Sequence, residues 1–516
     1  MTQLTSIQIK ALIVLVAMGA FFIRLPELDL RPMHGDEANQ AHKTGILIEE
    51  GTYIYDPHDH HGPTLYYLAR IAASLSGQDS YAQTNETTYR IVPVIFGTLL
   101  ILVTLLLYPA LSPLTLLYSA LIVAVSPAFI FYSRYYIQET LLVFFTLTTI
   151  GFGYRYLRNP RLSTAIGLGA SLSLMHATKE TAIIAYIAMA AGLVATGWIY
   201  RESRLISDFK KKTSRNHLIA GLAIALAINI LLFTAFFSNL RGPLDSILTY
   251  GNYLKRADGA GLHDKPWHYY LHLLFYTNKG PQYWFSEGFV AGLGLIGIAL
   301  NIWLARRKKV SPLTLFLSVY TLAMIIIYAL IPYKTPWSML SFYHGLALVA
   351  AITCANLTAS IKPLPMKATA VIIILAAIIH LSYQGHIVNR VIPADPRNPY
   401  VYAHTSTAFM KMPQRVDDIR AVHPNPEEMR VYIIQPDADY WPLPFYLRKH
   451  PNVGFFSTVP ENPDADIIIA APSTRTVLAE RLKDTYFTET GGLRPSVLRH
   501  VYIRQDLWDA YMVDRQ

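Results

Sequence analysis

Apolar runs long enough to cross a lipid bilayer recur along the first three quarters of this 516-residue chain. A helix needs about 20 mostly apolar residues to span the hydrocarbon core of a bilayer. Runs near that length lie at residues 7–25, 88–108, 112–131, 138–154, 163–176, 181–200, 217–237, 286–304, 311–331, 336–357 and 368–385. The sequence therefore predicts a mainly α-helical, polytopic membrane protein with about eleven transmembrane helices.

The distribution of charge separates this chain from soluble and nucleic-acid-binding proteins. Only 15% of its residues are charged, against roughly 25% in soluble domains. The net charge of +10 does not indicate a nucleic-acid partner, because the basic residues lie in short loops between apolar runs. These residues are Arg155, Arg158, Arg161, Arg201, Arg204, Lys210, Lys211, Lys212, Arg215, Arg306, Arg307, Lys308, Lys309, Lys362 and Lys367. Short basic loops face the cytoplasm, so we expect a multi-pass protein of the inner (plasma) membrane with its N-terminus inside and its C-terminus outside.

The first apolar run, Ile7 to Leu25, has two interpretations. One is a secretory signal peptide, and the other is an uncleaved first transmembrane helix, which the length of the run favours. Both place residue 30 and its neighbours outside the cytoplasm. The only cysteine, Cys354, lies inside an apolar run, which excludes an intramolecular disulfide and a cysteine metal site.

The composition changes to that of a soluble domain near residue 386. Residues 430–434, 453–456 and 466–470 are predicted strands, and residues 443–450 and 474–483 are predicted helices between them. We therefore expect a membrane domain at 1–385, with an outer loop at 26–87, and a small extracytoplasmic α/β domain at 386–516.

Four polar motifs interrupt the apolar runs, and the predicted topology places all four at the outer face. They are His34–Glu37, Ser133–Glu139, His176–Glu180 and Pro332–Trp337. Ionisable groups near the bilayer are costly and usually face a cavity where they act. A further outer loop, Ser238 to Ser286, is long enough to cover such a site.

Asp36 and Glu37 are the candidate catalytic residues. In one interpretation they only cap a helix and favour its first turn. In the other, a carboxylate acts as a general base towards an acceptor hydroxyl that attacks the anomeric carbon of a sugar carried by a polyprenyl phosphate. The membrane-border position and the three basic motifs on the same face favour the second interpretation.

Three basic side chains are candidates to bind the phosphate of such a donor: Arg134, Lys179 and Lys334. The alternative for each is an ion pair with a neighbour, such as Arg134 with Glu139 or Lys179 with Glu180. The remaining side chains of the motifs and of the first outer loop are predicted to bind substrate or support the site: His34, His61, Glu139, Glu180, Tyr333 and Trp337.

A histidine-rich segment in the first outer loop gives a weak metal prediction. His58 and His60 point the same way in an extended segment and would hold a divalent metal. The alternative is a polar turn between Pro57 and Pro63, with Pro63 at the start of the next helix. The sequence implies no other cofactor.

The motifs together resemble those of a known superfamily. The matching segments are residues 33–37, 55–57, 61–63, 133–134, 177–181, 333–337, 398–406 and 440–444. This arrangement is similar to that of the GT-C membrane glycosyltransferases, which include protein mannosyltransferases and aminoarabinose transferases. It most resembles the prokaryotic proteins named flippase-activity-associated. The resemblance implies a GT-C-like fold, with Asp36 as the base and Lys179 as a phosphate ligand.

Two functions from different classes remain open at this point. The first is a glycosyltransferase that moves a sugar from a polyprenyl-phosphate donor to a lipid-linked glycan, a polysaccharide or a protein at the outer face. The second is a non-enzymatic component of a machine that flips or assembles lipid-linked oligosaccharides. The polar motifs gather at one face, whereas a translocation path needs polar groups through the midplane and at both faces, so the sequence favours the first.

Overall fold

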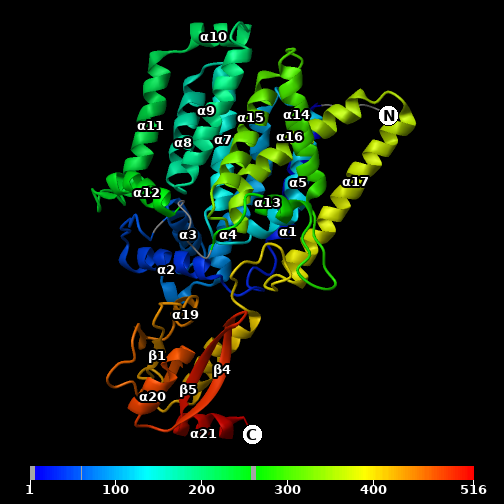
Figure 1. Cartoon of the computed structure of the whole chain (residues 1–516). Coiled ribbons are helices and arrows are strands. Elements are labelled where there is room, and N and C mark those ends of the chain that lie inside the picture. The colour runs from blue at the N-terminus through cyan, green and yellow to red at the C-terminus, as the bar shows by residue number, and fades with distance from the viewer. Residues whose placement is uncertain (1–5, 60, 257–262, 516) are drawn as a thin grey trace.

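The computed structural model of the chain describes residues 6–59, 61–256 and 263–515. Within these ranges, nine helices are long and apolar enough to cross a membrane, and in Figure 1 they stand together as one bundle. They are α1 (Ser6–Arg24), α4 (Glu86–Val103), α7 (Glu139–Arg158), α9 (Ala182–Ile199), α11 (Arg215–Phe233), α14 (Gly288–Ala305), α15 (Pro312–Leu330), α16 (Leu340–Ser360) and α17 (Leu364–His386). The predicted fold class, a mainly helical multi-pass membrane protein, is confirmed.

Two of the expected spans form helices that are shorter than a bilayer. The run at 163–176 becomes α8 (Leu162–His176), whose 15 residues extend only about 22 Å at 1.5 Å per residue. The run at 112–131 divides into α5 (Pro113–Val125) and α6 (Pro127–Tyr132). Proline lacks the N–H that a continuous helix would need at position 127, so the backbone turns at Ser126 and a new helix starts.

Helices at the two ends of the bundle complete the membrane domain. The outer loop holds α2 (Gly35–Glu50) and α3 (Thr64–Leu75). α12 (Gly242–Arg256) lies near them, α13 (Tyr269–Phe275) packs on α14, and α10 (Arg204–Lys212) crosses the opposite end. Short 3-10 or π turns occupy 81–83, 104–107, 336–339, 387–391, 407–410 and 472–474.

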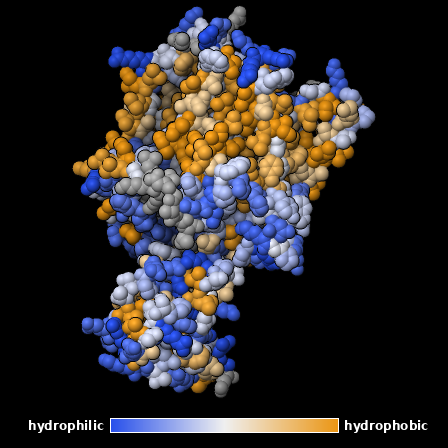
Figure 2. Space-filling model, in the orientation of Figure 1, coloured by the Kyte–Doolittle hydropathy of each residue, from blue (hydrophilic) through white to orange (hydrophobic). Residues whose placement is uncertain are grey.

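The surface of the bundle has separate apolar and hydrophilic regions, as expected for a membrane protein. Figure 2 shows a broad apolar band around the middle of the bundle and hydrophilic surface at both ends. The basic loops join α7 to α8, α9 to α11, α14 to α15 and α16 to α17, and all four lie at the end that α10 crosses (Figure 1). The C-terminal domain lies at the other end, beside α2 and α3.

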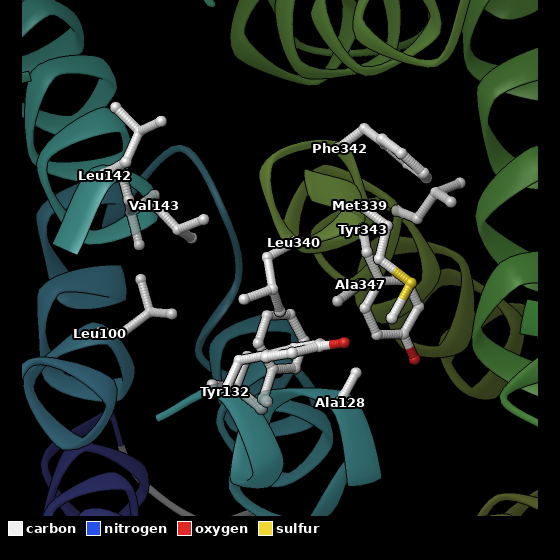
Figure 3. Packing of buried hydrophobic residues seen from close by; sticks show 14 of the residues in the cluster. Leu100, Ala128, Tyr132, Leu142, Val143, Met339, Leu340, Phe342, Tyr343 and Ala347 are labelled. Atoms are coloured by element: carbon white, nitrogen blue, oxygen red, sulfur yellow. The ribbon is translucent and has the colours of Figure 1, made fainter. Parts of the chain in front are cut away.

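The core of the bundle is packed from helices that are distant in sequence. Leu100 of α4, Leu142 of α7, Tyr132 of α6 and Leu340 of α16 are at most 2% exposed and converge in Figure 3. Burying each such side chain stabilises the fold by about 1.5–3 kcal/mol. This packing joins α4, α6, α7 and α16, and the motifs at 133–139 and 332–337 lie at the ends of the last three helices.

The C-terminal domain has a five-stranded sheet in the order β2-β1-β3-β5-β4. Its elements are α18 (Lys411–Val422), β1 (Val431–Ile434), α19 (Leu443–Tyr446), β2 (Val453–Phe456), β3 (Ile467–Ala470), α20 (Arg475–Arg481), β4 (Tyr486–Arg494), β5 (Val497–Arg504) and α21 (Gln505–Asp514). β1 pairs in parallel with β2 and β3, whereas β5 pairs antiparallel with β3 and β4. The three predicted strands are confirmed, and the hairpin of β4 and β5 was not predicted.

Candidate active site

The two adjacent acids at the start of α2 point into different surroundings. Asp36 has an exposed side chain, with a relative exposure of 54%, whereas that of Glu37 is 0%. His34 caps the helix: its Nδ1 accepts a hydrogen bond from the backbone N–H of Asp36 at 3.0 Å and lies 3.8 Å from Asp36 Oδ2. Asp36 is thus a solvent-accessible carboxylate beside an imidazole.

Glu37 is held by a complete set of buried donors. Arg90 donates to both carboxylate oxygens, at 2.8 and 2.7 Å, and Arg31 adds a contact at 3.3 Å. The backbone N–H groups of His34 and Tyr136 donate at 3.0 and 2.9 Å. Burial alone would raise the pKa of Glu37, but the charges of Arg90 and Arg31 hold that pKa well below its ordinary value.

The same arginines attach the outer loop to the bundle. Arg90 donates to the carbonyl oxygens of Leu28 and Arg31 at 2.6 and 2.8 Å, and Arg31 donates to the carbonyl oxygen of Arg134 at 2.8 Å. Glu37 therefore joins the start of α2 to α4 and to the turn before α7. The sequence did not indicate Arg31 or Arg90 as site residues. An arginine close to the start of a transmembrane helix can equally well anchor that helix at the membrane surface.

An aromatic and imidazole layer lies under Asp36. Nε2 of His34 is 3.1 Å from the carbonyl oxygen of Tyr402, which can only accept, so Nε2 carries the proton and Nδ1 is the acceptor. The His34 ring stacks on His404 at 5.6 Å and meets Trp337 edge-on at 5.7 Å. His34 is thereby fixed in one orientation by residues of the 333–337 motif and of the segment that leads to the C-terminal domain.

His263 is a second imidazole in this region that the sequence did not indicate. Its Nδ1 lies 2.8 Å from Tyr402 Oη, and its ring contacts Tyr333 with centroids 4.9 Å apart. Burial lowers the pKa of His263, and the nearby carboxylate of Asp36 opposes that shift. Tyr333 itself is 42% exposed, so an aromatic surface borders Asp36.

Lys334 is 1% exposed and bonded to the backbone. Its ammonium group donates to the carbonyl oxygens of Lys265, at 3.3 Å, and of Ile331. The backbone N–H of Lys334 donates to the carbonyl oxygen of His263 at 3.0 Å. Part of the outer loop 238–286 therefore reaches the 333–337 motif, as the bridge between Asp264 and Tyr333 also shows.

The second half of the outer loop docks on the 176–180 motif. His61 Nδ1 lies 2.9 Å from Glu180 Oε2, and the Thr64 hydroxyl donates to the carbonyl oxygen of Ala177 at 2.7 Å. Gly62 permits this approach, because a Cβ there would lie 2.2 Å from the Ala177 oxygen. Burial would raise the pKa of Glu180, but the His61 ring, a backbone N–H group and the Lys179 ammonium group together lower that pKa below its ordinary value.

Like Lys334, the other two predicted phosphate ligands are engaged with protein groups. Lys179 is 8% exposed and forms an ion pair with Glu139, the first residue of α7. Arg134 is 6% exposed and donates to the carbonyl oxygens of Arg24, Pro26 and Glu27 at 2.8–2.9 Å. Among the described residues, no hydrogen bond or ion pair joins Arg134, Lys179 or Lys334 to Asp36 or to one another.

Lys43 is a cation near Asp36 that the sequence did not indicate. It lies seven residues after Asp36, which is two turns along the same face of α2. Its Nζ contacts Asp59 Oδ2 at 2.9 Å. Burial lowers the pKa of Lys43, while the carboxylates of Asp59, Asp56 and Asp36 raise it. A lysine in an amphipathic helix is common, so the sequence alone does not mark Lys43 as a site residue. The fold brings Lys43 towards Asp59 and Asp56.

The metal prediction rests on residues that the structure covers only in part. His60 lies outside the described residues. His58 Nδ1 is 3.3 Å from the side-chain nitrogen of Asn252. In the described part of the chain, no group of three or more His, Cys, Asp or Glu side chains is arranged to hold a metal ion.

The fold and this arrangement define a class of protein. A bundle of apolar helices, a loop that carries α2 and α3, and a small C-terminal α/β domain form a GT-C-like fold, and the chain is a multi-pass membrane protein with that fold. The sequence profile of the dolichyl-phosphate-mannose-protein mannosyltransferase family matches residues 14–239. Among curated proteins, none matches this chain.

Solved structures support the same class. The chain aligns with ArnT from Cupriavidus metallidurans bound to undecaprenyl phosphate at a TM-score of 0.63 and 15% identity, over 95% of this chain and 97% of ArnT. It also aligns with the archaeal oligosaccharyltransferase AglB from Archaeoglobus fulgidus, in complex with an inhibitory peptide and a dolichol-phosphate. That alignment has a TM-score of 0.54 and 14% identity, over 97% of this chain and 74% of AglB.

Proposed function

We propose that the chain is a membrane glycosyltransferase that transfers a sugar from a polyprenyl-phosphate donor, with Asp36 as the general base. The observation that carries the proposal is the position of Asp36. It is an exposed carboxylate on a helix that Glu37, Arg31 and Arg90 fix to the bundle at its membrane border. A base must be accessible to substrate and held in place, and Asp36 meets both requirements.

The proposed reaction is a single displacement at the anomeric carbon. An acceptor hydroxyl attacks that carbon and gives its proton to an Asp36 oxygen, while the bond from the anomeric carbon to the phosphate oxygen breaks. The polyprenyl phosphate leaves as an anion with the bonding electron pair, so the leaving group needs no general acid. Attack from the side opposite the phosphate inverts the anomeric configuration.

The donor phosphate needs positive charge close to Asp36. We place it at the face of α2 that carries Lys43, with Lys179 as the second cation, because each of these lysines holds a carboxylate that a phosphate could replace. Arg134 and Lys334 donate to backbone carbonyl oxygens, and we propose that they support the site from below. His34, Tyr333 and Trp337 then border the sugar, and His61 and Glu180 fix the second half of the loop.

The comparison structures agree with this substrate class. ArnT was solved bound to undecaprenyl phosphate, and AglB was solved in complex with a dolichol-phosphate and an inhibitory peptide. For this chain we propose a polyprenyl-phosphate sugar as the donor and a lipid-linked glycan, a polysaccharide or a protein as the acceptor. We propose no step that involves a metal ion.

A transfer assay tests the proposal. Purified protein in detergent receives a panel of synthetic polyprenyl-phosphate donors with labelled sugars and a panel of acceptors. We expect time-dependent transfer with inversion at the anomeric carbon. The alternative, a non-enzymatic part of a flipping machine, predicts no transfer in detergent and an accumulation of lipid-linked glycan in the cytoplasmic leaflet when the gene is deleted. That pair of results would overturn the proposal.

The proposed orientation has its own test. In a Cys354→Ala background, a cysteine at exposed Glu461 of the C-terminal domain should react with an impermeant maleimide in intact cells. A cysteine at exposed Lys211 of α10 should react only after the membrane is opened. Reaction at position 211 in intact cells would show that the chain is inserted the other way, with α2 and Asp36 inside.

A further inference from the structure

A large cavity lies in the bundle far from Asp36. It has a volume of about 780 Å³ and is lined almost entirely by apolar side chains of α7, α8, α9 and α15, and this volume falls in the range of about 300–1,000 Å³ that is typical of ligand sites. Phe209 of α10 and Arg158 at the end of α7 also line it. The cavity therefore opens at the end of the bundle that α10 crosses, opposite α2 (Figure 1).

The packing of the helices explains why this space exists. α8 packs closely on α11, where Gly169 meets the backbone of Gly221, and α9 packs closely on α15, where Gly192 meets Phe316. Consecutive helices α8 and α9 make little contact with each other. Two tight helix pairs thus leave a gap between them. Leu193, which lines the gap, is 60% exposed, so the gap opens sideways to the lipid.

Two polar atoms in the wall of this cavity have no partner. Tyr156 Oη and Thr196 Oγ1 are buried, and among the described residues neither has a hydrogen-bond partner. Tyr156 is only 5% exposed, and both residues line the cavity. An unpaired buried hydroxyl is unfavourable, so a ligand with acceptor oxygens that reached these two residues through the cavity would gain by pairing with them.

We propose that this cavity binds one anionic phospholipid from the leaflet on the α10 side. An acyl chain enters between α8 and α9, and the ester and phosphate oxygens accept hydrogen bonds from Tyr156 and Thr196. The headgroup lies at Arg158, which is exposed at the mouth of the cavity. The basic loops at this end of the bundle favour an anionic headgroup, since nearby Lys and Arg side chains attract anionic lipid.

The chemistry of the wall distinguishes this ligand from the tail of a polyprenyl phosphate. A donor whose phosphate lies at α2 would reach this end of the bundle only with its hydrocarbon tail. Such a tail has no oxygen to accept from Tyr156 or Thr196 and no charge to meet Arg158. A phospholipid of the near leaflet supplies an acyl chain, acceptor oxygens and a negative charge together.

Native mass spectrometry of the purified full chain tests the site, with phosphatidylglycerol and phosphatidylcholine added at equal concentration. We expect one tightly retained phosphatidylglycerol per chain. Ala190→Trp places a bulky ring at the wall of the cavity, where it obstructs part of the space, and should lower that affinity at least about 10-fold. The matched control Ile187→Trp lies on the same helix, is 55% exposed and does not line the cavity, and it should bind as the wild type does.

Milder variants keep the test decisive if the tryptophan variant fails to fold. Tyr156→Phe and Thr196→Val should each lower affinity about 2- to 10-fold. Arg158→Gln should reduce the preference for phosphatidylglycerol over phosphatidylcholine about 5-fold, whereas Lys367→Gln, at a distant helix of the same end, should not. Wild-type protein without retained phospholipid, unchanged binding in all cavity variants, or displacement of phosphatidylglycerol by synthetic polyprenyl phosphate would overturn the proposal.

Discussion

Asp36 and Glu37 are adjacent in the sequence but have opposite surroundings. Asp36 lies at the exposed start of α2, and Glu37 lies in the buried hydrogen-bond network beneath it. Asp36 faces solvent, and the His34 imidazole lies 3.8 Å from its carboxylate. Glu37 accepts hydrogen bonds from two arginines and two backbone N–H groups and has no exposed surface. One carboxylate is available to react, and the other is fully used in holding the loop to α4 and α7.

This difference shows how a carboxylate can be positioned at a membrane surface. An isolated first turn of a helix frays easily, since its N–H groups lack partners within the helix. Here Glu37 and the His34 cap attach that turn to the bundle, so Asp36 is fixed without being buried itself. The comparison predicts that changes at Asp36 affect activity, whereas changes at Glu37 affect the fold first.

The largest effect should follow removal of the base. Asp36→Asn keeps the size of the side chain and removes its basicity, so transfer should fall about 10²–10⁴-fold while the thermal unfolding temperature stays near that of the wild type. The transfer assay and a thermal unfolding curve in detergent measure the two. Asp29→Asn, an exposed acid of the same loop, is the matched control and should keep full activity. Near-normal transfer by Asp36→Asn would mean that Asp36 is not the base and only stabilises the start of α2.

The next largest effect should be on stability. Glu37→Gln leaves the guanidinium groups of Arg31 and Arg90 buried without their counter-charge, and breaking a buried pair in this way costs about 3–5 kcal/mol. We expect a large loss in the free energy of unfolding and proteolytic cleavage within residues 26–87. Glu50→Gln, an exposed acid at the other end of α2, should change neither. If Glu37→Gln folds normally but is inactive, the roles of the two acids are the reverse of those proposed.

The sequence predicted the helical bundle well because spanning length and apolar composition are local properties. The sequence did not predict the break at Pro127, where one expected span divides into two helices. It also did not predict the hairpin of β4 and β5, because residues 489–493 of β4 contain two glycines and no strict alternation of apolar residues. The parallel strands β1 and β3 were predictable, since each is a short, continuous apolar run that the sheet buries.

The site was predictable only in part, because partners are set by tertiary contacts. The sequence indicated His34, Asp36 and Glu37 by their position at a membrane border, but it could not tell which acid is exposed. Arg90 was hidden because it lies within the fourth helix, 53 residues from Glu37. Lys43 and His263 were hidden because their neighbours come from other segments. That Arg134, Lys179 and Lys334 bind phosphate stays a prediction from the sequence, and the proposed site keeps Lys179 in that role and gives Arg134 and Lys334 a supporting one.

A double-mutant cycle separates a structural role of Lys179 from a role in donor binding. Lys179→Met alone leaves Glu139 buried without its partner, so a loss of function would be ambiguous. Lys179→Met with Glu139→Gln removes both charges and should recover most of the stability. If Lys179 binds the donor phosphate, the double variant should still bind polyprenyl phosphate about 10- to 100-fold more weakly, since a charge-assisted contact contributes about 1.5–3 kcal/mol. Glu139→Gln alone is the control. Wild-type affinity in the double variant would show that the ion pair of Lys179 and Glu139 stabilises the fold and does not bind the donor.

The smallest expected effect is the dependence of stability on pH. The pKa of Glu37 in the folded protein is lowered, so its contribution to stability is complete above the unfolded pKa of about 4.3 and is lost as pH falls towards the folded value. From pH 5 to pH 3 that loss is about 2 kcal/mol in the free energy of unfolding. The measurement is the unfolding free energy of wild type, Asp36→Asn and Glu37→Gln at both pH values. Wild type and Asp36→Asn should show the same acid loss, whereas Glu37→Gln should lack this part of it. A Glu37→Gln variant as acid-sensitive as the wild type would mean that the ionised Glu37 does not stabilise the loop, and the contrast between the two acids would fail.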